Sequence, residues 1–205
     1  MTMLPLILKA AGFGLAVAAP VGPMSLLCMR RTLALGWRQG LATGFGIATG
    51  DGLYAAVAAL GLAGVAAFLF AHERGLHAGA GVLLLWLGVA AWRAGGEERP
   101  AEAPGEIAWP AAYAGAVALT LANPPTIITF AAIFTALAPP GGFAAGAAAA
   151  TVGGVFAGSA LWWCGIVGGV TLARHALGER TKRWIDRIAG LVFIGFGLLQ
   201  LAQSL

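Results

Sequence analysis

Charged residues are nearly absent from six long stretches of this 205-residue chain. A helix needs about 20 apolar residues to cross a bilayer. The apolar runs are Ala10 to Met29, Leu41 to about Ala71, Gly75 to Trp92, Trp109 to Leu137, Phe143 to Ala173 and Ile188 to Leu205. Only 10% of the residues are charged, against about 25% in soluble domains. The sequence therefore predicts an all-α integral membrane protein with six transmembrane helices. The polar end of the last run leaves a five-span alternative open.

The basic residues predict the orientation of these spans. Cytoplasmic connections carry an excess of Lys and Arg, and ten of the twelve such residues fall in the connections after the first, third and fifth runs. These ten are Arg30, Arg31, Arg38, Arg93, Arg99, Arg174, Arg180, Lys182, Arg183 and Arg187; the other side has only Lys9 and Arg74. We therefore expect a multi-pass protein of the bacterial cytoplasmic (inner) membrane with both termini outside. A cleaved signal peptide is the alternative for the first run, but Arg30 and Arg31 follow it as a stop-transfer pattern.

The two halves of the chain resemble each other weakly. Three matches occur in the same order, at shifts between 104 and 109 residues: 15–20 with 119–124, 50–54 with 158–162, and 81–90 with 190–199. Each half has three spans, so the halves would cross the membrane in opposite senses, as in the inverted repeats of secondary transporters. The expected division is a first repeat over 1–95, a polar cytoplasmic linker over 96–108 and a second repeat over 109–205. Chance similarity of Gly/Ala/Leu-rich spans is the alternative.

Doubled prolines interrupt the first and fourth runs at corresponding positions. The first run contains Pro20-Val21-Gly22-Pro23 and the fourth contains Asn123-Pro124-Pro125. Proline removes a backbone donor and breaks a helix, and interrupted spans in matching positions indicate a transport site. The half-helix beyond each break offers backbone N–H groups that attract an anion such as a carboxylate. A kink used only for packing is the alternative.

Asp51 is the only acidic residue that falls within an apolar run. The other seven lie in the predicted connections: Glu73, Glu97, Glu98, Glu102, Glu106, Glu179 and Asp186. An acid at the bilayer centre costs about 2.5–3.5 kcal/mol and is a functional candidate by default. Asp51 is therefore predicted to carry a coupling proton or to hold a substrate ammonium, and the sequence does not separate these roles. A structural hydrogen bond across helices is the alternative.

Other residues give weaker signals. Candidates to line the pathway are Ser25, Thr126, Thr129, Tyr54 and Trp162, each of which could equally serve packing. The predicted substrate-binding set is Pro20, Gly22, Pro23, Ser25, Asn123, Pro124, Thr126, Tyr54 and Trp162. His72, His77 and His175 are expected to be solvated in connections. Gly-x-x-x-Gly pairs permit close helix contact, begin at residues 40, 46, 154 and 165, and leave a homodimer open.

Three motifs in order resemble the LysE/RhtB amino-acid exporters. They are Pro20-x-Gly-Pro23, Gly46-x-x-x-Gly50-Asp51 and Asn123-Pro124, and the basic stretch from Arg30 to Gly40 fits as well. The resemblance covers essentially the whole chain. It implies a secondary transporter that exports amino acids or related small metabolites, with protons as the coupling partner. Pro125 stands where many members have Lys, so the solute of Lys-bearing members is not carried over.

Three rival functions make demands that the sequence does not meet. A metal or inorganic cation exporter needs several converging ligands, and Asp51 is a single one. A thiol–disulfide electron carrier of the DsbD type needs two exchanging cysteines, whereas Cys28 and Cys164 do not follow the helix-breaking prolines. A non-transporting scaffold would gain nothing from a buried acid. We expect no enzyme activity, cofactor, metal or nucleic-acid partner.

Overall fold

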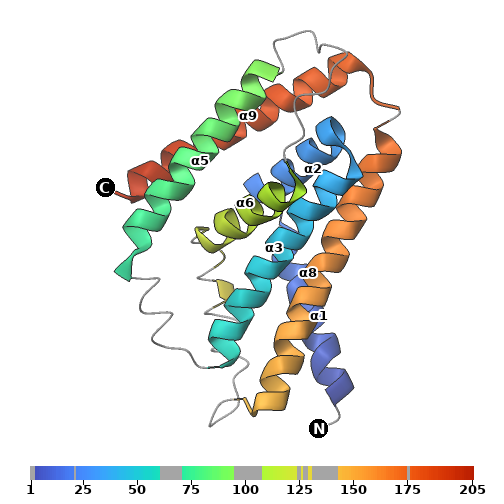
Figure 1. Ribbon diagram of the computed structural model, residues 1–205, viewed down its shortest axis with the longest axis vertical. Coiled ribbons are helices and arrows are strands. Elements are labelled where there is room, and N and C mark those ends of the chain that lie inside the picture. The colour runs from blue at the N-terminus through green and yellow to red at the C-terminus, as the bar shows by residue number, and fades with distance from the viewer. Residues whose placement is uncertain are drawn as a thin grey trace.

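The protein is a bundle of α-helices (Figure 1). The computed structural model describes residues 3–20, 22–60, 71–94, 108–123, 126, 129–130, 143–174 and 176–205. Within these residues the helices are α1 (Met3–Ala18), α2 (Pro23–Leu35), α3 (Trp37–Ala59), α5 (Glu73–Ala94), α6 (Trp109–Leu121), α8 (Ala145–Ala173) and α9 (Glu179–Gln203), and no strand occurs among them. The predicted linker over 96–108 lies outside the described residues except for Ala108.

The predicted break in the first run is confirmed. Helix α1 ends at Ala18 and α2 begins at Pro23, with a bend of 82° between them. Pro23 occupies the first turn of α2, where its missing N–H costs no hydrogen bond. The second half-helix continues to Leu35, so Arg30 and Arg31 lie in a helix and not in a connection. The connection to α3 is a single residue, Gly36, with φ of 92°, a conformation that glycine adopts without strain.

The fourth run is also interrupted where its prolines begin. Helix α6 ends at Leu121, and Ala122 and Asn123 continue as turn and irregular chain. Pro124 and Pro125 lie outside the described residues, as does most of the remaining run to Leu137. In the described part of the second run, α3 ends at Ala59 and Leu60 forms its C-cap, and residues 61–70 lie outside the described residues.

Close glycine contacts hold α3, α6, α8 and α1 together. Helix α3 packs against both α6 and α8, and α8 packs against α1. A Cβ atom at Gly50 would lie 2.6 Å from the Thr120 side chain, and one at Gly158 would overlap the backbone oxygen of Ala11. Backbones that approach this closely need a residue without a side chain, as in small-residue helix contacts in lipid.

Helices α5 and α9 form a second, antiparallel pair with reciprocal glycine contacts. Gly81 lies against Gly197, and Gly88 lies against Gly190; in each pair a Cβ on either glycine would be 3.0 Å from the other's backbone oxygen. His77 on α5 hydrogen-bonds Gln200 on α9, and both side chains are buried. The prediction that His77 is solvated was therefore wrong: it turns inward and finds a partner on the neighbouring helix.

Among the described residues, three helices are long and apolar enough to cross a membrane: α5, α8 and α9. Helices α1 and α2 would add a fourth span if the bent pair is taken as one. Helix α3 is 23 residues long but carries Arg38, Gln39 and Asp51, which lower its hydropathy. The last run was predicted to begin at Ile188, but α9 begins at Glu179. It therefore takes up residues predicted to lie in the fifth connection.

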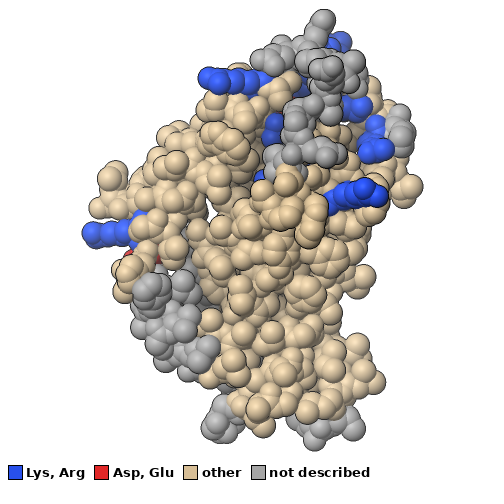
Figure 2. Space-filling view, viewed as in Figure 1, with Lys and Arg blue, Asp and Glu red and all other residues tan. Residues whose placement is uncertain are grey.

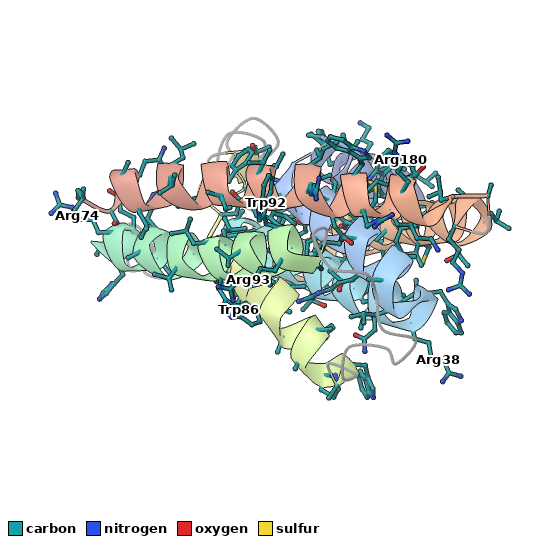
Figure 3. All side chains as sticks on the ribbon, turned by 90° about the horizontal axis from the view of Figure 1, so that it is seen from above. Arg38, Arg74, Trp86, Trp92, Arg93 and Arg180 are labelled. Atoms are coloured by element: carbon teal, nitrogen blue, oxygen red, sulfur yellow. The ribbon has the colours of Figure 1, made fainter. Side chains whose placement is uncertain are left out.

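The basic residues gather at one end of the molecule (Figure 2). Arg30 on α2 forms an ion pair of 2.8 Å with Asp186 on α9, and Arg174 at the end of α8 lies beside Gly36. Asp186 is buried within α9, so its predicted place in a connection was wrong. Arg74 lies at the opposite end of α5 from Arg93 (Figure 3). Below the basic end, the tan surface in Figure 2 shows charged side chains only at its left edge, near the start of α5 in Figure 1.

Candidate functional site

The broken first span and the end of α6 border a cavity of about 460 Å³. Its described lining comes from α1, α2, α3, α6, α8 and α9 and from the residues around the two breaks. The lining residues are Phe13, Ala16, Val17, Ala18, Pro20, Gly22, Pro23, Met24, Ser25, Ile47, Asp51, Thr120, Asn123, Thr126, Thr129, Trp163 and Phe196. Small-molecule sites typically measure about 300–1,000 Å³ and have mostly apolar walls with a few polar groups. The cavity matches this description in size and composition.

The break between α1 and α2 forms one wall of the cavity. Pro20, Gly22, Pro23 and Ser25 all line it, so the structure brings together the residues predicted from the first interruption. The Ser25 hydroxyl donates a hydrogen bond of 3.2 Å to the Pro20 carbonyl. Gly22 is the N-cap of α2 and supplies no side-chain cap. The first turn of α2 thus borders the cavity without the side-chain cap that a Ser, Thr, Asp or Asn would provide.

The residues around the second break lie on the same cavity. Asn123, Thr126 and Thr129 line it together with Thr120 of α6. Thr120 donates a hydrogen bond of 2.9 Å to the Ala116 carbonyl within its own helix. Pro124, which the sequence also predicted, lies outside the described residues. Residues of both interrupted runs thus line one cavity.

Asp51 joins the cavity from the middle of α3. Its carboxylate accepts a hydrogen bond of 2.7 Å from the Ser159 hydroxyl on α8, and its side chain is only 3% exposed. Gly50 and Gly158, the neighbours of these two residues, permit close packing against α6 and α1. Asp51 is the only charged side chain among the described residues that line the cavity. It is therefore positioned to meet a cation or a proton.

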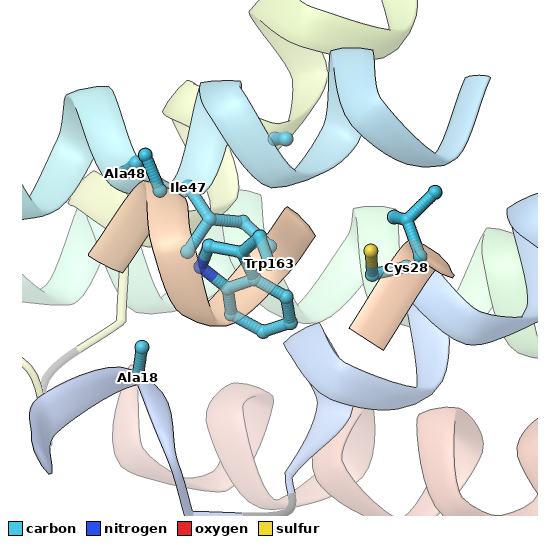
Figure 4. Close-up of a cluster of buried hydrophobic side chains, with 8 residues drawn as sticks. Ala18, Cys28, Ile47, Ala48 and Trp163 are labelled. Carbon is cyan, nitrogen blue, oxygen red and sulfur yellow. The ribbon is translucent and has the colours of Figure 1, made fainter. Parts of the chain in front are cut away.

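Trp163 adds an aromatic wall that the sequence did not single out. It is 2% exposed and packs in a cluster with Ala18, Cys28, Ile47 and Ala48 (Figure 4). Ile47 lies one turn before Asp51 on α3, and both line the cavity. Met24 of α2 and Phe196 of α9 extend the apolar lining.

Two predicted residues lie away from the described cavity wall. Tyr54 is buried, donates a hydrogen bond to the Leu121 carbonyl and stacks on Phe130 with ring centroids 5.8 Å apart. It closes the turn at the end of α6, so its contacts are structural. Trp162 packs at the edge of the Trp163 cluster and does not line the cavity. One residue along α8 turns the helix by about 100°, which separates these adjacent tryptophans.

Arg31 is a buried charge that the sequence assigned to a connection. Its guanidinium donates hydrogen bonds of 3.1 Å to the Thr43 hydroxyl on α3 and to the Ala112 carbonyl on α6. Both acceptors are uncharged. Arg31 therefore ties α2 to α3 and α6 at the basic end of the bundle, and it does not line the cavity.

The His, Cys, Asp and Glu side chains of the described residues bear on the metal and thiol alternatives. No group of three or more His, Cys, Asp or Glu side chains there could hold a metal ion. Cys28 is buried in α2 and Cys164 is exposed on α8, and both are free.

Apolar membrane-length helices around a cavity with one buried carboxylate define a multi-pass membrane protein of the transporter class. Comparison with protein families supports the same class. The model of the family described as "LysE type translocator" matches residues 15–204, and the chain therefore belongs to this family. Comparisons with curated proteins and with solved structures gave no match.

Proposed function

We propose that the protein exports amino acids or related small metabolites from the cytoplasm in exchange for protons. The observation that carries this proposal is the shared cavity, because both interrupted spans and Asp51 line it. A carboxylate, a helix start and polar side chains around one space suit a solute that carries both a cation and an anion. Membership of the translocator family supports the transport class.

The start of α2 would hold the carboxylate of the solute. Helix N-termini attract anions through free N–H groups and the helix dipole. Gly22 and Pro23 place this start on the cavity wall, and Ser25 adds a hydroxyl one turn further on. Asn123 and Thr126, at the second break, would complete the polar side of the site.

The proton and the solute's ammonium would compete for the Asp51 carboxylate, and this competition would couple export to proton entry. When the site faces the cytoplasm, Asp51 gives up its proton and its carboxylate binds the solute's ammonium. When the site faces outward, the solute leaves and Asp51 takes a proton from that side. One proton would then enter for each zwitterion exported, and Asp51 would never cross without either proton or solute.

The packing supports an architecture of two inverted three-helix repeats. Asp51 and Ser159 occupy corresponding positions of the repeat and hydrogen-bond each other. The α5–α9 contacts are reciprocal. Gly81 contacts Gly197, the counterpart of Gly88, and Gly88 contacts Gly190, the counterpart of Gly81. Helix α1 packs on α8, and its counterpart α6 packs on α3. A pseudo-twofold axis that passes between Asp51 and Ser159 would relate the two halves of the chain. The protein would then have six spans in total.

The charge distribution supports an orientation in which both termini lie on the outer side of the cytoplasmic membrane. The basic end seen in Figure 2 would face the cytoplasm. Cysteine labelling in a variant with Cys28 and Cys164 replaced by Ala tests this. An impermeant maleimide added to intact cells should label Arg74→Cys, at the start of α5, and should leave Arg180→Cys, at the start of α9, unlabelled. The opposite pattern would reverse the orientation.

Efflux from proteoliposomes tests the function. Vesicles preloaded with labelled amino acids would be assayed with and without an imposed pH gradient, for the native protein and for Asp51→Asn. We expect efflux that follows the gradient in the native protein and is lost in the variant. Asn keeps the shape of Asp and can still accept the Ser159 hydrogen bond, so folding should be retained.

The same assay separates the rival functions. Gradient-driven efflux by Asp51→Asn would rule out proton coupling through this residue while leaving export intact. No efflux of any amino acid by folded, inserted protein would contradict the proposal. Other metabolites and inorganic cations would then be tested.

A further inference from the structure

A buried hydrogen-bond donor on the cavity wall has no partner among the described residues. The indole Nε1 of Trp163 is buried and makes no hydrogen bond with any described residue, although Trp163 lines the cavity. An indole nitrogen can only donate, and a buried donor without an acceptor is costly. Such groups are rare in folded proteins unless water or a ligand completes them.

The ring nitrogen lies on the cavity side of the indole. Figure 4 shows it at the end of the ring nearest Ile47 and Ala18, and away from Cys28. Ile47 and Ala18 line the cavity, whereas Cys28 does not. The nitrogen atom itself has almost no accessible surface, so a molecule in the cavity would meet the N–H once the side chains beside it shift. Since the N–H can only donate, the group that meets it must be an acceptor such as a carboxylate.

The charges around the cavity limit what else the molecule can carry. Asp51 is the only charged side chain among the described lining residues. Of the stretches outside the described residues, 61–70 and 131–142 contain no Lys, Arg, Asp or Glu, whereas 95–107 contains Glu97, Glu98, Arg99, Glu102 and Glu106. One carboxylate can neutralise one ammonium, and a further buried charge without a partner carries a heavy penalty.

Apart from Asp51 and the side chains with hydroxyl or amide groups, the described lining residues are apolar. Phe13, Val17, Met24, Ile47 and Phe196 contribute to it. An aliphatic, thioether or aromatic side chain would bury its surface against these groups, with a gain roughly proportional to the area removed from water. Among the described lining residues, a lysine or arginine side chain would find no second carboxylate, and a glutamate side chain would find no cation.

We infer that the cavity takes zwitterionic amino acids with uncharged, largely apolar side chains, and that Trp163 donates its indole N–H to their carboxylate. The inference rests on the proposed function, since it names which solutes the same site accepts. It assigns to Trp163 a binding role that the neighbouring Trp162 does not share, because Trp162 lies off the cavity.

The first experiment compares solutes with the unmodified protein. Proteoliposomes would be loaded in turn with leucine, methionine, phenylalanine, lysine and glutamate at equal concentration. We expect efflux of the first three to exceed that of lysine and glutamate by at least about tenfold, the factor that corresponds to 1.4 kcal/mol. Preferred efflux of lysine or glutamate would overturn the inference and leave the proposed export function standing. No efflux of any of the five would overturn both.

The second experiment compares two neighbouring variants, Trp163→Phe and Trp162→Phe. Both remove an indole nitrogen that is buried without a hydrogen-bond partner among the described residues, but only Trp163 lines the cavity. Loss of a hydrogen bond to a charged group should raise the KM for leucine efflux about 10- to 100-fold in Trp163→Phe. The maximal rate should be retained, and Trp162→Phe should leave both quantities near their native values.

Two results would contradict the role of Trp163. One is a native KM in Trp163→Phe. The other is an equal rise in KM in both variants, which would indicate a packing effect of α8 as a whole. If Trp163→Phe fails to fold, the solute comparison with the unmodified protein still tests the inference.

Discussion

Ser159 on α8 donates a hydrogen bond of 2.7 Å to the carboxylate of Asp51 on α3, and both side chains are almost wholly buried. This bond joins the two halves of the chain at the edge of the cavity that we propose as the transport site, because Asp51 lines the cavity and Ser159 does not. It also supplies a buried carboxylate with a donor, which makes an acid in this position less costly.

The Ser159–Asp51 bond should contribute measurably to stability. Ser159→Ala removes the donor and should lower the free energy of unfolding by about 1.5–3 kcal/mol, the range for hydrogen bonds to charged groups. In an Asp51→Leu background the same change should cost less than about 0.5 kcal/mol, because no acceptor remains. Reversible unfolding in detergent micelles measures both values. Equal costs in the two backgrounds would show that the bond does not couple these residues.

The Gly158 contact should be intolerant of even one methyl group. A Cβ at Gly158 would overlap the Ala11 backbone oxygen, and backbone cannot move aside as a flexible side chain can. Gly158→Ala should therefore push α1 and α8 apart and destabilise the protein by about 1–3 kcal/mol.

Gly165 offers a matched control on the same helix. It also begins a Gly-x-x-x-Gly pair, but nothing lies within 4 Å of a Cβ built there. Gly165→Ala should leave stability unchanged or raise it slightly through better helix propensity. Thermal unfolding in detergent compares the two variants, and equal destabilisation would argue against the α1–α8 contact.

Local chemistry made part of the site predictable. Proline lacks an N–H in any context, so the helix interruption could be predicted from the residues Pro20 to Pro23 alone. Asp51 was predictable because a lone acid in an apolar run has few explanations. That these features share one cavity needed the tertiary structure, although the matching positions of the breaks pointed to it.

Features that depend on helix rotation were not predictable. Helix α8 is apolar all round, so no periodicity shows which face meets α3, and the sequence favoured Trp162 over Trp163. His77 and Asp186 lie near the ends of apolar runs, where polar residues usually meet water. Their burial depends on Gln200 and Arg30, which lie 123 and 156 residues away in sequence, and local rules cannot identify partners at such separations.

The Arg30–Asp186 ion pair should anchor α9 to α2. Its side chains are 16% and 4% exposed, and removing one partner of a buried pair costs roughly 3–5 kcal/mol. Asp186→Asn and Arg30→Gln should each destabilise the protein. The exchanged variant, Arg30→Asp with Asp186→Arg, should recover part of the loss.

Thermal unfolding of these variants, together with leucine efflux, tests the anchor. Arg38 provides a control. Its guanidinium carbon lies 5.5 Å from the centroid of the Trp37 ring, and it forms no ion pair with another described residue. Arg38→Gln should change stability little. If the exchanged variant is no better than Asp186→Asn, the two charges do not stabilise each other.

The His77–Gln200 contact gives a prediction about the α5–α9 pair. Both side chains are buried, so removing one leaves the other unsatisfied. His77→Leu should lower the free energy of unfolding by about 1–3 kcal/mol. The double variant, with Gln200→Leu added, should recover most of this loss, since two apolar partners need no hydrogen bond. Unfolding in detergent measures these two variants and the single variant Gln200→Leu. If the double variant is as unstable as the sum of the single ones, the polar pair does not act as a unit.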